Sequence, residues 1–435
     1  MTADVARTRT PLGPRYRRLW AASALSNLAD GVVKVALPLV AIGLTRSPAL
    51  IAGLTFALTL PWLLFALTAG ALADRQDRRR LMLGANAVRA GLLAAMAIGM
   101  LLGADSIWAL YVLAFCLGTA ETVFDTSAQS ILPQVVTRPQ LSRANARLYA
   151  AELTANQFLV PPLGGFLVAA GAAVAFGLPS ALWVLAIAAL ALVEGPFRLA
   201  RGTPTTVRAD IGEGLRFLWH HRLLRRFAMM TGLFNFATSA VWAVLVLHLV
   251  GPQSAVGLSE PGYGVLLTAV AVGSLLGSFI AERAEQRLGR ARSLLLAYLT
   301  GALLVAVPGL TTDPLVIGMV FALGGTGMVI ANVIVVSLRQ QLTPDRLLGR
   351  VNSGYRLVAW GTMPLGAAAG GLLGQVAGLR AVFLVMGVLT ACVVTGLIGI
   401  SDQDLQDAPP TADPMIDDPS PATPATPPPA APPRR

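Results

Sequence analysis

Several charged side chains of this sequence fall inside long apolar stretches, and they occur in pairs spaced four residues apart. Asp30 and Lys34 form one such pair, Glu121 and Asp125 form another, and Arg89 stands alone. A charge at mid-bilayer costs about 2.5–3.5 kcal/mol, so a residue of this kind normally faces a cavity or a partner. The chemistry that carboxylates offer there is proton exchange, which would let proton flow drive another process.

Two interpretations fit Asp30 and Lys34. Residues four apart share one face of a helix, so they could form an ion pair that neutralises itself and tolerates burial. Alternatively, Asp30 exchanges a proton or binds substrate, and Lys34 sets its proton affinity through the nearby positive charge. Both are compatible with the spacing.

Glu121 and Asp125 are expected to have different roles, because they lie at different depths in the membrane. Glu121 falls near the middle of its apolar stretch, without an obvious partner in the sequence, and is a candidate for proton coupling. Asp125 lies nearer one end, at a depth similar to that of Arg89. Glu152, near the expected start of another apolar stretch, is predicted to be an interfacial, solvated carboxylate.

The composition requires a membrane to surround these residues. The 435-residue chain is 55% hydrophobic and 13% charged, and about twenty apolar residues suffice to cross a bilayer as a helix. The sequence therefore predicts an all-α integral membrane protein. Twelve transmembrane helices are expected, at 19–42, 49–72, 81–103, 107–132, 149–171, 174–193, 227–250, 262–282, 293–309, 314–338, 354–377 and 380–400.

The arginines set the predicted topology. The net charge is +11, and nearly all basic residues fall in the termini and in alternate loops, with only Arg46 and Arg380 on the opposite side. Positive loops are retained in the cytoplasm, so both termini are predicted to be cytoplasmic. This distribution also argues against nucleic acid as a partner.

The two halves of the chain are related in sequence. Leu141-Ser-Arg-Ala-Asn145 matches Leu348-Gly-Arg-Val-Asn352, and Gly70 corresponds to Gly277. Repeated six-helix halves are typical of transporters that rock around a central site. The predicted domains are an N-terminal arm at 1–18, bundles at 19–193 and 227–400, a cytoplasmic linker with a surface helix at 194–226, and a disordered Pro/Ala/Asp-rich cytoplasmic tail at 401–435.

Five short motifs resemble the major facilitator superfamily, in the branch of the macrolide-efflux proteins and the enterobactin exporter, a drug:proton antiporter type. They are Ala36-Leu-Pro38, Thr45-x-Ser-Pro48, Gly70-x-Leu-Ala-Asp-Arg-x-Asp-Arg-Arg79, Leu132-Pro133 followed by Leu141-x-x-Ala-Asn145, and Pro162-Leu-Gly-Gly165. The resemblance covers about residues 15–400. One departure is that Pro161 stands where the antiporter motif of the family has Gly, which weakens that motif as support for antiport.

The resemblance implies roles for two further sets of residues. A charge network that latches the inward side shut would comprise Gly70, Asp74, Arg75, Arg78, Arg79, Arg89 and Asp125, with Arg89 or Arg78 as the partner of Asp125. Spans 1, 4, 7 and 10 would line the central cavity, which brings in Asn27, Phe124, Asn235, Trp242 and Asn332 beside Asp30 and Glu121. Each aromatic residue in this set could equally be helix packing.

The expected function is secondary active transport in the bacterial plasma (inner) membrane, as proton-coupled efflux of an amphipathic small molecule by alternating access. A lipid transporter on the same fold is the alternative. No phosphate-binding loop for ATP is present, and no nucleophile–base arrangement or metal-ligand cluster indicates an enzyme, a metal site or a cofactor. Protons and membrane lipids are the other expected partners, and the protein is expected to be monomeric.

Overall fold

The computed structural model describes residues 12–137, 140–195, 197, 207–344, 347–399 and 402, and its described part is built of helices. Eleven of these helices are long and apolar enough to cross a membrane, which confirms the predicted class of multi-pass all-α membrane protein. The helices are α1 (Gly13–Leu44), α2 (Pro48–Arg75), α3 (Arg78–Leu101), α4 (Ile107–Val135), α5 (Leu141–Thr154), α6 (Val160–Ala169), α7 (Ala172–Ala191), α8 (Val207–His220), α9 (Arg222–Leu249), α10 (Glu260–Leu288), α11 (Arg290–Ala306), α12 (Pro314–Leu342), α13 (Leu348–Ala377) and α14 (Leu379–Val393).

A twelfth span is interrupted. Helix α5 continues through a π-helical turn at Ala155–Leu159 into α6, which begins just before Pro161 and Pro162. A π-turn adds a residue to the helical turn and commonly occurs where a helix must bend or rotate its face. Proline removes backbone donors at the same place, so the double proline accounts for a local change in helical register.

The predicted start of this span was eight residues too late, because Arg143 and Arg147 lower the hydropathy of its first two turns. Helix α5 begins at Leu141, so Glu152 lies about 16 Å along this helix at 1.5 Å per residue. The Glu152 side chain is exposed, and its position at the membrane interface stays a prediction. Helix α13 likewise begins at Leu348 and not at 354.

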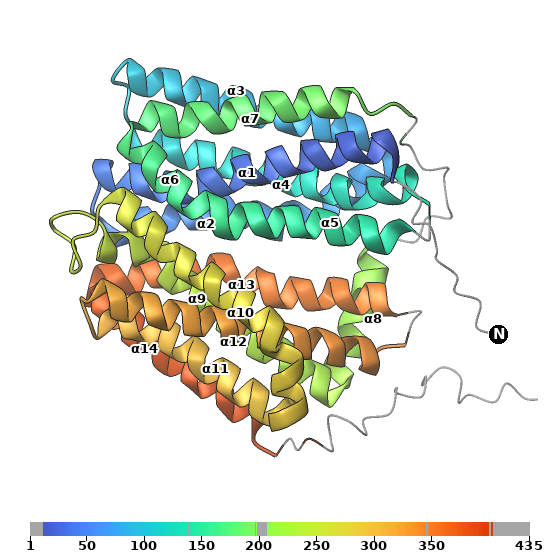
Figure 1. The fold of residues 1–435 in the computed structure, drawn as a ribbon, viewed down its shortest axis with the longest axis vertical. Coiled ribbons are helices and arrows are strands. Elements are labelled where there is room, and N and C mark those ends of the chain that lie inside the picture. Colours follow the sequence, from blue (N-terminus) through green and yellow to red (C-terminus); the bar gives the residue numbers. More distant parts are fainter. Residues whose placement is uncertain are drawn as a thin grey trace, which may run out of the picture.

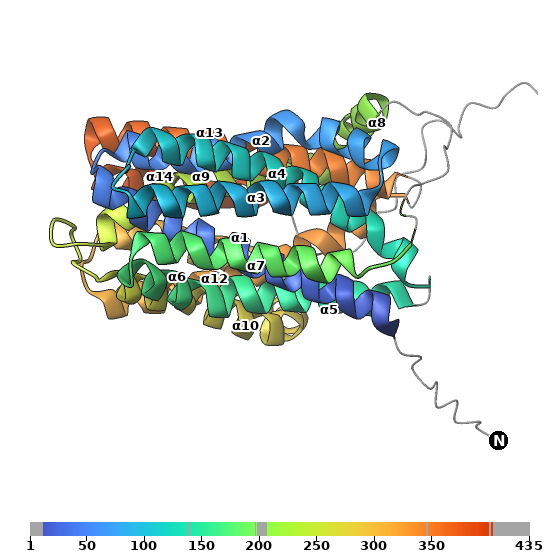
Figure 2. The same ribbon diagram turned by 90° about the horizontal axis from the view of Figure 1, so that it is seen from above.

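The helices run nearly parallel and form two groups. Helices α1–α7 lie in the upper part of Figure 1 and α9–α14 in the lower part, and the view from above in Figure 2 shows the same long axis for all of them. A cytoplasmic linker with a surface helix was predicted at 194–226, and helix α8 lies within this range. Its Leu218 is buried, and Glu213 forms an ion pair with Arg350 of α13, so α8 is docked onto the second group.

The two groups meet tightly at the end where α1 joins α2. Gly165 of α6 and Gly264 of α10 lie so close to the opposite backbone that a Cβ would clash with the carbonyl oxygens of Glu260 and Pro161 respectively. Such close backbone approach requires small residues. The glycines thus let α6 and α10 pack directly against each other.

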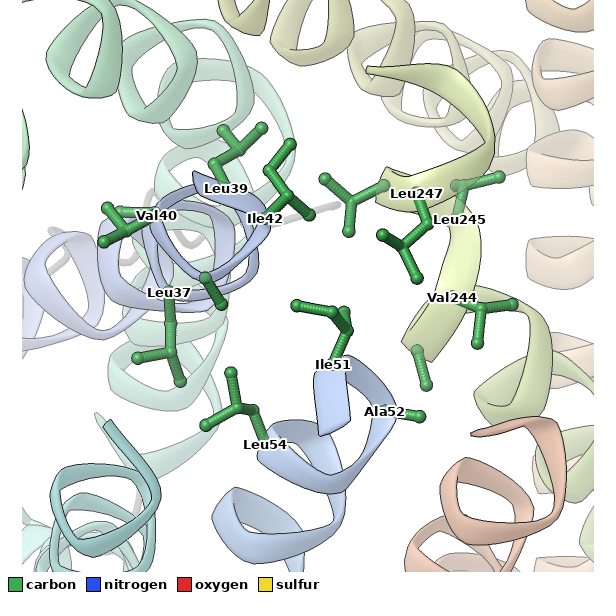
Figure 3. Packing of buried hydrophobic residues seen from close by; sticks show 14 of the residues in the cluster. Leu37, Leu39, Val40, Ile42, Ile51, Ala52, Leu54, Val244, Leu245 and Leu247 are labelled. Atoms are coloured by element: carbon green, nitrogen blue, oxygen red, sulfur yellow. The ribbon is translucent and has the colours of Figure 1, made fainter. Parts of the chain in front are cut away.

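Apolar side chains complete this closure. Figure 3 shows Ile42 of α1, Ile51 of α2 and Leu247 of α9 close to one another, and Leu39 and Val244 belong to the same buried cluster. All five residues are buried. Two polar contacts border the cluster, from Arg46 Nη1 to the Val250 carbonyl oxygen at 3.0 Å and from Ser47 Oγ to Gln375 Oε1 at 2.9 Å. This end of the molecule is therefore sealed by both halves.

Candidate functional site

Two ion pairs join helices in the middle of the first group. Lys34 Nζ lies 2.7 Å from Glu121 Oε1, and Arg89 Nη1 lies 3.2 Å from Asp30 Oδ2. Asp30 and Lys34 share a helix face as predicted, but each pairs with a different helix and not with the other. Glu121, for which the sequence showed no partner, is held by Lys34.

Arg89 is fully buried and enclosed by aromatic rings. Its guanidinium carbon lies 5.1 Å from the ring centre of Phe124 and 5.4 Å from that of Trp183. Arg89 Nη1 also donates to Ser26 Oγ at 3.3 Å. Cation–π contacts stabilise an arginine that is withdrawn from water. Phe124, predicted to line a cavity, is instead buried packing beneath Arg89.

The Lys34–Glu121 pair differs because it borders open space. The Lys34 side chain is 50% exposed and that of Glu121 13%. Asp125 follows one turn later on α4. Within the described part of the chain Asp125 has no ion-pair partner inside 4 Å, and Arg89, one of its two predicted partners beside Arg78, pairs with Asp30. The negative charge of Asp125 acts across the halves on Arg356 of α13.

A second part of the site is a cavity of about 570 Å³ among α9, α11, α12 and α13. Asn235 and Asn332 line it, where the sequence analysis expected cavity residues. Asn235 Nδ2 donates to the Ala359 carbonyl oxygen at 2.8 Å, which orients the amide. Trp242 packs against Phe321 with ring centres 5.7 Å apart and is not on this lining. Asn27 Nδ2 donates to the Ser23 carbonyl oxygen within α1.

Cationic and aromatic side chains dominate the polar lining of this cavity. Arg339 lies 4.2 Å from the ring centre of Tyr355, and Arg356 lies 4.3 Å from that of Trp360. The sequence did not single out these two arginines, because Arg339 follows the end of the predicted span 314–338 and Arg356 lies at the start of the predicted span 354–377. The internal repeat contained the missing signal, since Leu348 aligns with the true start of α5.

The loop between α2 and α3 is anchored to the end of α7. Asp77 Oδ1 accepts a hydrogen bond from the Arg80 N–H at 3.0 Å and so caps α3. Arg79 Nε donates to the Leu190 carbonyl oxygen at 3.1 Å, at the negative end of the α7 dipole. Arg78 is buried in the first turn of α3 and Gly70 lies within α2. The side chains of Asp74 and Arg75 lie outside the described residues.

These features define a membrane transporter of two six-helix halves, with ion pairs inside the first half and a cavity lined by arginine and aromatic side chains in the second. Comparison with known proteins narrows the class. Residues 8–416 match the family described as "Transmembrane secretion effector". The chain therefore belongs to this family of major facilitator transporters, which are not enzymes.

Named relatives are exporters. The multidrug efflux pump Tap of Mycobacterium tuberculosis is 29% identical over 409 residues, covering 89% of this chain and 93% of its own. The Tap protein of Mycolicibacterium fortuitum is 29% identical over 428 residues, covering 92% and 100%. The enterobactin exporter EntS of Citrobacter koseri is 26% identical over 346 residues, covering 78% and 80%.

Solved structures share the fold. The nucleoside transporter NupG superposes with a TM-score of 0.69 at 12% identity, over 89% of this chain and 98% of its own. A bacterial homologue of the iron transporter ferroportin gives a TM-score of 0.70 at 17% identity, over 88% and 98%. At these identities the comparison concerns the fold alone.

Proposed function

We propose that this efflux transporter is driven by protons and exports amphipathic small molecules across the bacterial plasma membrane, with both termini in the cytoplasm. The observation that carries the proposal is the Lys34–Glu121 pair, a carboxylate held in the membrane by a half-exposed amine. Relatives named as a multidrug pump and a siderophore exporter support this direction of transport and this kind of cargo.

Proton binding to Glu121 would break its ion pair with Lys34. The freed ammonium group of Lys34 then adds a positive charge beside the transport path. Coupling results if Glu121 gains its proton when the transporter is open to one side of the membrane and loses it when the transporter is open to the other. Asp30 completes the coupling group, because it holds Arg89 one turn before Lys34 on α1. One proton moving down 100 mV supplies about 2.3 kcal/mol, enough for a roughly fortyfold gradient of cargo.

The cargo would lie between two unlike surfaces. The first half presents Asp125 and Glu152, whereas the second half presents Arg339 and Arg356 beside aromatic rings. Asn235 and Asn332 add orienting amides. A cavity with a few polar groups among apolar and aromatic walls suits an amphipathic molecule.

The transport cycle would move two bundles, 19–193 and 227–400, as nearly rigid units. Closure of the inner side would bring Asp125 toward Arg356. The loop residues Gly70, Asp74, Arg75, Arg78 and Arg79 would hold the first bundle in shape during this movement, without touching cargo. We propose that the transporter works as a monomer surrounded by lipid.

The test is proton release from everted membrane vesicles that contain the protein. A chemically broad panel of cationic, zwitterionic and anionic amphipaths is added after a pH gradient has been formed. We expect some compounds to dissipate the gradient, and Glu121→Gln to remove the response at equal protein level. Export without proton movement would refute coupling, and lipid translocation with no response to any compound would favour the lipid transporter.

A further inference from the structure

A groove of about 880 Å³ runs between α1 and α5, away from the transport site. Its walls are mostly small and apolar, including Ala24 and Leu28 of α1 and Ala151 of α5. Arg17 and Arg147 stand at one end of it. We propose that this groove binds a phospholipid with an anionic headgroup, taken from the leaflet at the N-terminal end of α1.

The groove is built by contacts between the two helices. Tyr16 Oη donates to the Ala144 carbonyl oxygen at 2.9 Å, and Trp20 Nε1 donates to the Arg147 carbonyl oxygen at 3.1 Å. Trp20 remains 39% exposed. An indole with one polar edge satisfied and its face open is suited to the boundary between headgroups and acyl chains.

The apolar wall of the groove points away from the interior of the first half. Leu28 and Asp30 are two positions apart on α1, so their side chains point about 200° apart around the helix axis. Asp30 points toward Arg89 and the interior of the first half. The wall formed by Ala24 and Leu28 therefore points outward, and Figure 2 shows the start of α1 and α5 along the lower edge of the ribbon.

The dimensions match one leaflet. Arg17 and Leu28 are eleven residues apart on α1, which corresponds to about 16 Å along the helix. Half of a hydrocarbon core of about 30 Å has nearly the same depth. A headgroup beside Arg17 would thus place its acyl chains along Ala24 and Leu28.

The charges select the headgroup. Arg17 and Arg147 are both exposed, and among the described residues neither has a carboxylate within 4 Å. Two guanidinium groups at a helix–helix groove on the cytoplasmic side are a recognised setting for anionic lipid headgroups. The guanidinium group of an arginine can also form two hydrogen bonds to one phosphate. A zwitterionic lipid gains less from this contact, because the positive group of its own headgroup is repelled by the arginine.

Binding can be measured by native mass spectrometry on the full chain, delipidated in an uncharged detergent and titrated with phosphatidylglycerol or phosphatidylcholine. We expect the wild type to prefer phosphatidylglycerol. The double variant Arg17→Gln/Arg147→Gln should lose roughly thirtyfold in affinity for phosphatidylglycerol and change little toward phosphatidylcholine. The control Arg222→Gln/Arg283→Gln removes the same charge from exposed positions outside the groove and should bind normally.

A second variant tests the groove without changing charge. Ala24→Phe fills the wall and should weaken binding of both lipids, whereas Ala95→Phe, on the exposed surface of α3, should not. Equal binding by the wild type and the arginine double variant would overturn the proposal, as would equal affinity of the wild type for both lipids. Displacement of phosphatidylglycerol by soluble glycerol phosphate would show a phosphate site and also overturn it.

Discussion

Lys34 of α1 and Glu121 of α4 are joined at 2.7 Å although 87 residues separate them in the chain. The pair links α1, which contributes Leu39 and Ile42 to the sealed end, with α4, which carries Asp125 toward the other end. Its charge state can therefore influence both ends of the transport path.

Glu121→Gln should abolish proton-coupled efflux while leaving the protein inserted. The amide cannot release a proton, so the ion pair with Lys34 can no longer be made and broken in each cycle. Drug-dependent proton release in everted vesicles measures the effect. Glu282→Gln, an exposed carboxylate on α10, is the control and should transport normally. Retained coupling in Glu121→Gln would exclude this carboxylate as the proton carrier.

Asp30→Asn should act mainly on stability. It leaves the fully buried guanidinium of Arg89 without its counter-charge, and breaking a buried ion pair costs about 3 kcal/mol or more. Thermal unfolding followed by tryptophan fluorescence in detergent should show a lower midpoint. Asp313→Asn, at the exposed start of α12, is the matched change. An unaltered midpoint with lost coupling would instead make Asp30 a proton carrier.

Gly165→Ala and Gly264→Ala should each prevent the sealed end from closing. The added methyl group would overlap backbone atoms of the opposite half, which cannot move as a side chain could. In a background lacking Cys116 and Cys392, a cysteine introduced at Ile51 should become reactive to a membrane-impermeant thiol reagent from outside.

Gly177→Ala provides the control for these variants, because a Cβ at Gly177 meets no atom within 4 Å. It should leave both transport and cysteine reactivity unchanged. If Gly165→Ala and Gly264→Ala transport at the normal rate with Ile51→Cys still protected, the seal does not depend on glycine packing.

Asp125 and Arg356 should be coupled energetically. A double-mutant cycle of Asp125→Asn and Arg356→Gln, read out as the rate of cargo efflux, is expected to give an interaction of about 0.5–3 kcal/mol. Arg356→Lys should retain part of this interaction energy, because the positive charge remains while the stacking of the guanidinium group on the Trp360 ring is lost. Additive effects would mean that the two residues act independently.

Much of the fold could be predicted because apolar length and the spacing of arginines are local properties of the sequence. The errors occurred where polar residues enter a span, as at Arg143 in α5 and Arg350 in α13, since hydropathy cannot tell a buried polar turn from a loop. The internal repeat would have corrected both starts together.

Pairing within the site could not be predicted in the same way. Spacing shows that Asp30 and Lys34 share a helix face, but the choice of partner depends on where α3 and α4 place Arg89 and Glu121. The aromatic enclosure of Arg89 by Phe124 and Trp183 has no local signal either, because the three residues come from three different helices.

Lys34 can also be labelled selectively among the side chains of this protein. It is the only lysine among 435 residues, so its side-chain amine can be labelled without engineering the protein. An amine-reactive reagent confined to one side of the membrane would report, through acylation of Lys34 distinguished from that of the N-terminal amine by peptide mapping, when the Lys34 side chain becomes accessible from that side. The transporter thus carries its own reporter group at the site proposed for proton coupling.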